Sequence, residues 1–313
     1  MAMFLKILQF YGRFLLSFSA IGFWWRQLFW PPFNPSFTGQ TWLVTGASGG
    51  LGKAIVQAAA KAGATVLAAA RSEAKLKDLI ADSGAAGANI IPVVADLSLQ
   101  SDTAAMIAKL NGEGRKIDVL MNNVGLLLDD LVITPEGRET TFATNILTHF
   151  QLTEKAIETG LLKPDAVVVN MSSGGMYNAP LLVSKMNVTD PKQYRGVFAY
   201  AVHKRGQAEL TKYWAQKYRA MKFYVMHPGW AKTDGVKTAL PRFYKILNTV
   251  LRDGHQGTDT AIWLAATKPN CEPGAFWLDR EPRSSHAFSM TRITKNIPQD
   301  LVDYLNKELA SKA

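Results

Sequence analysis

A tyrosine and a lysine four residues apart are the side chains in this sequence whose types and spacing most directly suggest chemistry. Tyr200 and Lys204 stand in the stretch FAYAVHKRGQAEL, residues 198–210. If this stretch is helical, the two residues lie on one face, with a rise of roughly 6 Å between their Cα atoms. A lysine cation near a phenol favours the phenolate, so the pair could move protons. The alternative is two ordinary exposed side chains on an amphipathic helix.

A glycine-rich turn follows the first apolar run in the main body of the chain. TWLVTG (41–46) is typical of a buried strand, and TGASGGLG (45–52) leads from it into a helical stretch. Gly46, Gly50 and Gly52 let backbone N–H groups and a helix N-terminus approach a pyrophosphate. A strand before the turn and a helix after it are the context that a dinucleotide site requires. We therefore predict a dinucleotide site; the alternative is a merely tight turn.

The residues after the second predicted strand indicate which dinucleotide binds. In a site that prefers NAD, an acidic residue about 20 positions beyond the glycines binds the ribose hydroxyls. This chain has Ala70, Arg71 and Ser72 there, and its first carboxylate is Glu73. A guanidinium can hydrogen-bond a 2′-phosphate and stack on adenine. The sequence therefore favours NADP(H); if Arg71 is a solvated surface residue, the site accepts NAD(H) as well.

Around these residues, short apolar runs alternate with longer helical stretches. The predicted strands are 41–46, 64–70, 90–96, 118–123, 166–172 and 222–228, and the predicted helices include 50–62, 98–111, 136–160 and 199–219. Strands that are apolar on both faces are buried between two helix layers, as in a parallel sheet. We predict an α/β fold of the Rossmann type, with a doubly wound parallel sheet, in a single domain spanning residues 40–313.

Seven short segments resemble, in order, motifs of the short-chain dehydrogenase/reductase family. They are TGASGGLG (45–52), VVADLS (93–98), NNVG (122–125), FATNILTHF (142–150), NMSSGG (170–175), YAVHK (200–204) and HPGWAKT (227–233). The resemblance implies a Rossmann-type fold and an NAD(P)-linked carbonyl reductase or alcohol dehydrogenase. Val124 and Thr148 replace the family's usual alanine and glycine, which are mild departures.

The resemblance also assigns roles to particular residues. Its catalytic set falls on Asn145, Ser173, Tyr200 and Lys204, with Ser172 as the alternative to Ser173. Together with the glycine turn and Arg71, it gives a cofactor-binding set of Gly46, Ser48, Gly50, Leu51, Gly52, Arg71, Asp96, Leu97, Asn123, Gly125, Tyr200, Lys204, Pro228, Gly229 and Thr233.

The mechanism implied by the resemblance centres on Tyr200 as general acid and base. Free tyrosine ionises near about pH 10, and we expect Lys204 and the positive nicotinamide of the oxidised cofactor to lower that pKa. Lys204 would also hold the ribose hydroxyls, and Ser173 would orient the substrate oxygen toward Tyr200. Asn145 would anchor a water that links Lys204 to solvent.

The composition of the chain limits the metal ions and macromolecules that it is expected to bind. The formal net charge is +10, and the single cysteine, Cys271, excludes an intrachain disulfide and suits a reducing compartment. The five histidines show no metal-ligand spacing with cysteine or carboxylates, so we predict no metal. The sequence has no dense run of Lys and Arg and no recognisable nucleic-acid module, so we predict no nucleic-acid partner.

Residues 1–33 differ in composition from the rest of the chain. Eight of the fifteen phenylalanines lie in residues 1–37, and no Asp or Glu occurs before Glu73. Polar residues recur at intervals that give a narrow polar stripe on a helix ending at Pro31–Pro32. We predict an apolar helical arm that lies in a membrane interface, which would make the protein peripheral or monotopic. The alternative is an arm packed on its own domain or on a second subunit.

A transmembrane span is a weaker third choice for this segment. Within residues 1–33, the longest uncharged stretch is residues 14–25, which is shorter than the roughly 20 apolar residues that a spanning helix needs. In a span, Arg13 or Arg26 would have to lie deep in the bilayer.

Two hypotheses of function follow. The first is a membrane-associated NADP(H)-dependent enzyme for a small lipophilic carbonyl or alcohol, and a homodimer is a further expectation. Residues 174–199 would form a loop over the substrate, and residues 233–252 either an apolar lid or an ordinarily packed helical segment. The second is a cofactor-bound scaffold or lipid-binding protein with the same fold and little turnover.

Overall fold

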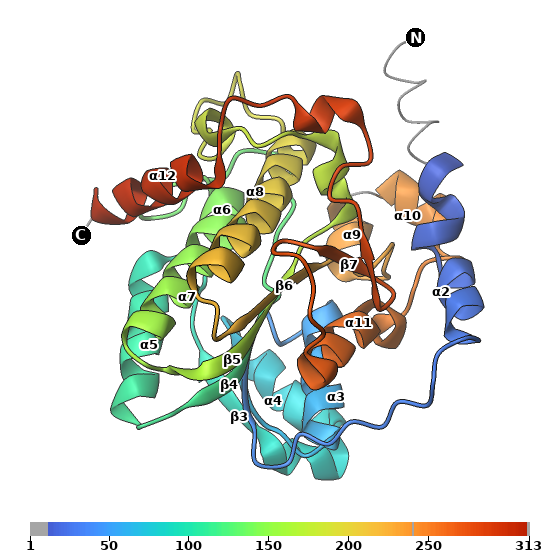
Figure 1. The fold of residues 1–313 in the computed structure, drawn as a ribbon. Coiled ribbons are helices and arrows are strands. Elements are labelled where there is room, and N and C mark those ends of the chain that lie inside the picture. Colours follow the sequence, from blue (N-terminus) through green and yellow to red (C-terminus); the bar gives the residue numbers. More distant parts are fainter. Residues whose placement is uncertain (1–11, 240, 312–313) are drawn as a thin grey trace.

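The structure, a computed structural model, describes residues 12–239 and 241–311 (Figure 1). In this part of the chain, the strands form one eight-stranded sheet in the order β3-β2-β1-β4-β5-β6-β7-β8. The strands are β1 (Thr41–Thr45), β2 (Thr65–Ala70), β3 (Ile90–Val94), β4 (Ile117–Asn122), β5 (Leu162–Met171), β6 (Lys222–Met226), β7 (Phe276–Leu278) and β8 (Glu281–Arg283). Neighbouring strands are parallel from β3 to β7, and β8 returns antiparallel to β7. The predicted Rossmann-type, doubly wound single domain is confirmed.

Helices cover both faces of the sheet (Figure 1). They are α2 (Ala20–Gln27), α3 (Gly50–Lys61), α4 (Glu73–Asp82), α5 (Gln100–Gly112), α6 (Thr140–Phe142), α7 (Thr148–Glu158), α8 (Gly196–Lys217), α9 (Asp234–Ala239), α10 (Pro241–Leu247), α11 (Gly254–Thr267) and α12 (Pro298–Ala310). Short 3-10 turns lie at Gly84–Asn89, Gly174–Asn178, Val183–Lys185 and Ser289–Arg292, and a π-helical turn lies at Ala143–Leu147.

Alternate residues of the central strands enter two different cores. Leu43 and Leu120 pack into the core shared with α5, α7, α8 and α12, whereas Val44 and Met121 pack into the core shared with α3, α4 and α11. Both sets are fully or almost fully buried. This two-sided burial explains why the strands are apolar on both faces.

The predicted helix at 136–160 is shorter and interrupted. It begins at α6, where the buried Glu139 carboxylate accepts hydrogen bonds from the N–H groups of Thr141 and Phe142. A π-helical turn, Ala143–Leu147, then separates α6 from α7. The hairpin β7–β8 was not predicted, because each strand has only three residues. Its turn places Asp279 and Arg280 at positive φ, a conformation that turn signals based on glycine do not reveal.

The N-terminal arm, defined here as residues 12–30, is bent rather than one continuous helix. Residues 12–18 are helical, and α2 begins after an extended backbone at Ser19. The bend is held by the main body, because Ala20 N donates to Val250 O (2.9 Å) and Arg252 Nε donates to Ser19 O (3.3 Å). Phe14, Phe18 and Phe23 are buried. The alternative prediction, an arm packed on its own domain, therefore holds for the face of the arm that carries these three phenylalanines. Residues 1–11 of the predicted segment lie outside the described residues.

Among the residues that the structure describes, none of the helices combines the length and the apolar character needed to cross a bilayer.

Candidate active site

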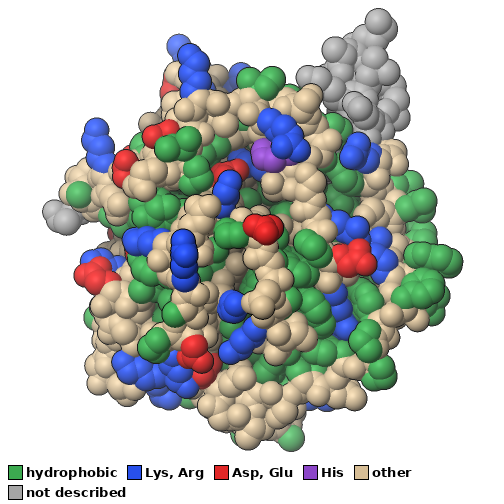
Figure 2. Space-filling model, viewed as in Figure 1, with side chains coloured by type: hydrophobic (Ala, Val, Ile, Leu, Met, Phe, Trp, Pro, Cys, Tyr) green, Lys and Arg blue, Asp and Glu red, His purple; other side chains and the backbone are tan. Residues whose placement is uncertain are grey.

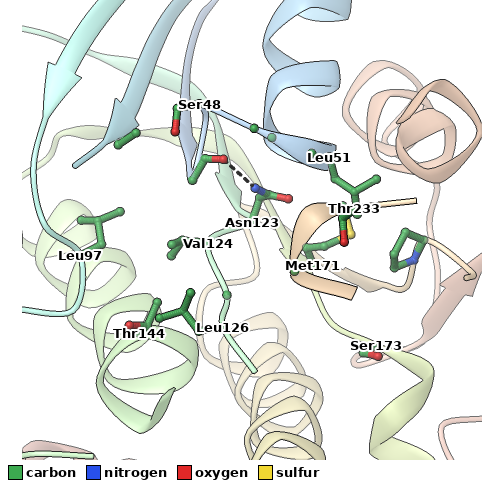
Figure 3. Close-up of a pocket in the computed structure, with 18 of the residues that line it drawn as sticks. Ser48, Leu51, Leu97, Asn123, Val124, Leu126, Thr144, Met171, Ser173 and Thr233 are labelled. Atoms are coloured by element: carbon green, nitrogen blue, oxygen red, sulfur yellow. Dashed lines mark hydrogen bonds between the residues drawn. The ribbon is translucent and has the colours of Figure 1, made fainter. Parts of the chain in front are cut away.

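A cleft of about 410 Å³ opens at the carboxyl ends of the parallel strands (Figure 3). Ligands of doubly wound folds bind at this edge of the sheet. The lining contains every predicted cofactor residue: Gly46, Ser48, Gly50, Leu51, Gly52, Arg71, Asp96, Leu97, Asn123, Gly125, Tyr200, Lys204, Pro228, Gly229 and Thr233. Ser172 and Ser173 also line it, together with residues that sequence reasoning missed, among them Thr144, Met171 and Val236.

The glycine turn has the shape that a pyrophosphate site needs. Gly46 and Gly50 have φ of +66° and +52°, a region that disfavours residues with side chains. A Cβ at Gly52 would lie 2.0 Å from Gly46 O, so only glycine lets α3 start this close to β1. The first turn of α3 carries no acidic residue, and no side chain caps its N-terminus. A helix N-terminus of this kind attracts phosphate.

Thr45 and Asn123 join the turn after β1 to the turn after β4. Thr45 Oγ1 accepts from the N–H groups of Asn123 (2.9 Å) and Val124 (3.1 Å). Asn123 Nδ2 donates to Thr45 O (2.9 Å) and lies 3.4 Å from Gly46 O (Figure 3). Sequence reasoning missed Thr45, because its hydroxyl acts through contacts with a segment almost eighty residues away.

Arg71 lies directly after β2, exposed at the rim of the cleft. The nearest carboxylate in the sequence, Glu73, forms an ion pair with Lys77 (2.8 Å). Ser72 caps α4 through Lys75 N (3.3 Å). The residues around Arg71 thus begin the next helix and place its guanidinium at the cleft, where a 2′-phosphate would fit its chemistry.

Ser173 rather than Ser172 lies beside Tyr200, because a Cβ added at Gly175 would contact both Ser173 Oγ and Tyr200 Cε1 (3.4 Å each). Ser173 Oγ accepts from Gly175 N (3.1 Å), which leaves the serine's own hydrogen free to be donated. Ser172 is turned to a structural contact, because its hydroxyl donates to the backbone carbonyl of Lys204 (2.9 Å). The geometry therefore places Ser173 beside the phenol.

Lys204 is almost completely buried, although its ammonium group reaches the cleft. Its Nζ donates to Met171 O (2.8 Å) and to Gln207 Oε1 (3.1 Å), and it lies 5.5 Å from the centre of the Tyr200 ring. Burial lowers the pKa of Lys204 to about 7. A buried ammonium has lost most of its hydration, which disfavours the charged form.

Burial governs the pKa of Tyr200 in the chain alone. Burial raises it above the ordinary value, and the hydrogen bond with Ser173 acts in the opposite direction. The predicted lowering of this pKa combined the Lys204 cation with the positive nicotinamide of the oxidised cofactor, and it stays a prediction for the cofactor-bound protein.

Asn145 lies behind the cleft and is fully buried. Its side chain holds the backbone of Leu126, with Nδ2 donating to Leu126 O (2.8 Å) and Oδ1 accepting from Leu126 N (2.7 Å). The role of Asn145 as the anchor of a water between Lys204 and solvent stays a prediction, and a side chain, Gln207, joins Asn145 to Lys204. Gln207 Nε2 donates to Asn145 O (2.6 Å), and Gln207 Oε1 accepts from Lys204. Sequence reasoning missed Gln207.

A phenol that can transfer a proton, set beside a dinucleotide cleft in a doubly wound sheet, defines the class of nicotinamide-dependent oxidoreductases. The family model described as short chain dehydrogenase matches residues 40–242. The chain belongs to the short-chain dehydrogenase/reductase family.

Curated relatives agree with this assignment. Dehydrogenase/reductase SDR family member 12 is 38% identical in Homo sapiens over 261 residues and 36% identical in Bos taurus over 258 residues, and each match covers 79% of both chains. Retinol dehydrogenase 12 of Mus musculus is 28% identical over 266 residues, which cover 82% of this chain and 79% of the relative.

Solved structures share the fold. An uncharacterised protein from Mycobacterium paratuberculosis has a TM-score of 0.70 at 21% identity, covering 89% of this chain and 96% of its own. A gluconate 5-dehydrogenase from Beutenbergia cavernae with bound NADP has a TM-score of 0.59 at 24% identity, covering 74% and 91%. A 3-ketoacyl-(acyl-carrier-protein) reductase from Brucella melitensis in complex with NADH has a TM-score of 0.58 at 22% identity, covering 77% and 96%.

Other expectations remain predictions. These are the absence of a metal and of a nucleic-acid partner, the homodimer, the membrane role of residues 1–33, and the placement of residues 174–199 over the substrate. The last segment is well anchored, since Arg205 donates to Ala179 O and to Met176 O (both 3.1 Å).

Proposed function

We propose that this protein is an NADP(H)-dependent carbonyl reductase or alcohol dehydrogenase for a lipophilic substrate at a membrane surface. The observation that carries the proposal is the position of Ser173 and Tyr200, which border the same glycine, Gly175, and line the same cleft as the glycine turn. A proton donor and a dinucleotide site in one cleft are the two parts that hydride chemistry on a carbonyl requires.

The residues present fit the cofactor. The N-terminus of α3 and its glycines would hold the pyrophosphate, Arg71 the 2′-phosphate and Lys204 the ribose hydroxyls. Pro228, Gly229 and Thr233 would hold the nicotinamide end. The bound nucleotide supplies the hydride.

The chain's own residues handle the proton. In reduction, the Tyr200 hydroxyl gives its proton to the carbonyl oxygen as the carbonyl carbon becomes a C–H carbon, and an alcohol results. Ser173 donates a hydrogen bond that orients this oxygen toward Tyr200. A charged Lys204 stabilises the phenolate that remains, since an opposite charge nearby favours the ionised form. In oxidation, Tyr200 accepts the alcohol proton.

The part of the cleft beyond the glycine turn is lined by apolar side chains, which favours an apolar substrate. Leu126, Met171 and Val236 line the cleft, and Val236 belongs to α9. Trp230, which precedes α9, and Phe243 of α10 have rings that meet edge to face with centres 5.4 Å apart. The segment 233–252 therefore contributes both to the wall of the cleft and to ordinary packing. We infer that α9 and α10 form an apolar lid over the cleft.

An exposed apolar surface supports the membrane part of the proposal. Side chains on the outer face of the arm are between 40% and 75% exposed: Leu15, Leu16, Ile21, Trp24, Trp25, Leu28 and Phe29. Figure 2 shows hydrophobic side chains gathered along the edge of the molecule where α2 lies. Arg242, Lys245 and the 77% exposed Ile246 stand on the neighbouring α10. Aromatic and cationic side chains together suit an anionic lipid surface.

The test of the reaction is the variant Tyr200→Phe, assayed with NADPH and a panel of lipophilic aldehydes and ketones that includes retinal. Loss of the general acid should lower kcat by about 10²- to 10⁴-fold. Affinity for NADPH, measured by fluorescence titration, should stay close to that of the wild type because the ring remains.

The result that would count against the reaction is equally clear. A wild-type protein that binds NADPH and lipid vesicles but reduces none of these substrates would favour the scaffold or lipid-binding alternative. A Tyr200→Phe variant with undiminished turnover would remove Tyr200 from the chemistry.

A further inference from the structure

Gln207 makes three hydrogen bonds behind the catalytic lysine. It lies on α8, one turn beyond Lys204, and is 1% exposed. Its Oε1 accepts from Lys204 Nζ (3.1 Å). Its Nε2 donates to Asn145 O (2.6 Å) and contacts His149 Nδ1 (3.0 Å).

These partners fix the orientation of the Gln207 amide. An ammonium group can only donate and a backbone carbonyl can only accept, so Oε1 must face Lys204 and the NH₂ group must face Asn145. His149 Nδ1 then accepts, and its Nε2 carries the hydrogen and donates to Val124 O (2.8 Å). Burial, together with the nearby Lys204, lowers the pKa of His149 to about 3, so the ring is neutral.

The network connects separate segments around the cleft. Val124 follows β4, Asn145 lies in the π-helical turn, and Met171 ends β5 and supplies the second acceptor for Lys204 (2.8 Å). Two hydrogens of the ammonium group are thus held by the protein, and the third is left for the cleft that Lys204 lines.

We propose that Gln207 is a positioning residue that holds the Lys204 ammonium toward the cleft and joins it to the Asn145 carbonyl. This role in the reaction rests on the proposed function. An amide keeps its hydrogens, so Gln207 fixes the ammonium group without carrying protons from it to the Asn145 carbonyl, as a water could.

The hydrogen bond with Gln207 is important for the charge of Lys204, because the two histidines near its ammonium are neutral. The titratable groups near the ammonium are Tyr200 and His203 on α8 and His149 on α7. Both histidines are neutral, since burial lowers the pKa of His203 to about 4 and that of His149 to about 3. The charged form of Lys204 therefore depends on its two hydrogen-bond acceptors, and its pKa is about 7 because of burial.

The experiment measures the charge of Lys204 without a ligand. The free energy of unfolding in urea is followed against pH for wild type, Gln207→Met and Gln207→Glu, each compared with the same background carrying Lys204→Met. A lysine with a lowered folded-state pKa binds fewer protons folded than unfolded above that pKa, so stability rises with pH from there. The pH at which this rise begins therefore reports the folded-state pKa of Lys204.

The two variants should move this pH in opposite directions. Gln207→Met removes an acceptor and should lower the onset by about one pH unit, whereas Gln207→Glu adds a carboxylate and should raise it by about as much or more. The midpoint of the pH dependence of NADPH affinity should move in the same directions. Turnover is not needed for either readout, so a failure of the proposed reaction would show separately in the activity assay.

Thr211→Val is the matched control. It removes two buried hydrogen bonds one turn further along α8, away from Lys204: Thr211 Oγ1 donates to Gln207 O (2.7 Å) and accepts from Asn170 Nδ2 (3.0 Å). It should leave the onset unchanged. Onsets that stay at the wild-type pH in both Gln207 variants, or that move in the same direction, would overturn the proposal. If Gln207→Met does not fold, the upward shift in Gln207→Glu alone decides.

Discussion

Arg71 and Lys204, the two cations of the cleft, stand in opposite environments. Arg71 is exposed after β2, whereas Lys204 is buried and its pKa is lowered to about 7. A guanidinium stays charged at any ordinary pH, so it can pair with a phosphate from the surface. A buried ammonium changes charge near neutral pH, so the fold must control it through contacts such as Gln207. Under the proposed function, Arg71 would recognise the phosphate and Lys204 would serve the proton chemistry.

Arg71→Ala tests the first of these tasks. Loss of a hydrogen-bonded charge pair costs about 1.5–3 kcal/mol, so NADPH affinity should fall by roughly 10- to 100-fold while NADH affinity stays nearly constant. Fluorescence titration of both nucleotides provides the measurement.

Lys75→Ala is the matched control, because it removes an exposed cation from α4 outside the cleft. It should change neither affinity. An equal loss of NADPH and NADH affinity in Arg71→Ala would show that Arg71 contributes to the adenine or ribose part instead, and that NADP(H) is not preferred through this residue.

The site could be predicted from sequence where spacing along the chain carries the chemistry. The glycine turn and the pair Tyr200–Lys204 are local patterns, and both line the cleft. Thr45 and Gln207 could not be found in this way. Their partners are distant in sequence, with Asn123 held by Thr45 and Asn145 held by Gln207. Only the folded chain brings these groups together.

At the scale of elements, a buried charge cluster fixes the arm to the main body. Asp279, in the turn between β7 and β8, accepts from Arg252 Nη1 (2.5 Å) and Nη2 (2.8 Å) and from Arg26 Nε of α2 (2.7 Å). Arg252 also donates to Ser17 O (2.9 Å). Asp279 and Arg252 are each 1% exposed. Arg252 N also donates to Trp230 O (2.8 Å), and Lys232 N donates to Arg252 O (2.7 Å), so the cluster also supports the segment that carries Pro228 and Gly229.

Asp279→Asn should destabilise the protein strongly. The change keeps the shape and tolerates the positive φ of 53°, but it leaves two arginines without their carboxylate. Breaking a buried ion pair by removing one partner costs about 3–5 kcal/mol in the free energy of unfolding. Urea unfolding measures this loss, and limited proteolysis should show faster cleavage within residues 12–30.

Glu281→Gln in the same hairpin provides the comparison. Its ion pair with Arg283 (2.6 Å) is exposed, and its loss should cost less than about 1 kcal/mol. Similar losses in the two variants would mean that the cluster does not hold the arm.

Elements were predictable where one periodicity runs through a segment. Five of the six strands from β1 to β6 lie within one residue of the predicted ranges, because each is an apolar run between helices. β5 begins four residues earlier than predicted, at Leu162, because Lys163 and Asp165 interrupt its apolar pattern. The bend at Ser19 escaped prediction because its cause, the contact with Arg252, lies more than two hundred residues away. The π-helical turn at Ala143–Leu147 likewise interrupts a helical pattern without any glycine or proline to mark it.

At the scale of the whole molecule, the arm has two different faces. Its inner face contributes Phe14, Phe18 and Phe23 to the core, while its outer face exposes Trp25, Leu28 and others. Burial of the outer face in lipid would place α10 and the lid segment at the same surface, close to a substrate dissolved in the bilayer. Burial against a second copy of the chain would instead give a homodimer with the arms between the subunits.

A double variant, Leu28→Glu with Phe29→Glu, distinguishes these two outcomes. The side chains are 75% and 72% exposed, so the fold should tolerate the change and NADPH affinity should be retained. Burial of a large apolar side chain contributes about 1.5–3 kcal/mol, so the variant should bind vesicles of phosphatidylcholine and phosphatidylserine at least about tenfold more weakly than wild type. Co-sedimentation measures the binding, and light scattering after gel filtration gives the oligomeric state.

The control for added charge is Ile293→Glu with Ile297→Glu. These side chains are 76% and 59% exposed, and they lie on the connection into α12 rather than on the arm. This control should bind vesicles as wild type does if the outer face of the arm is the lipid contact. Equal weakening in both double variants would mean that net charge alone governs binding. A third outcome would assign the outer face to a second subunit. In it, neither the wild type nor the arm variant binds vesicles, and the wild type is a dimer that becomes a monomer in the arm variant but not in the control.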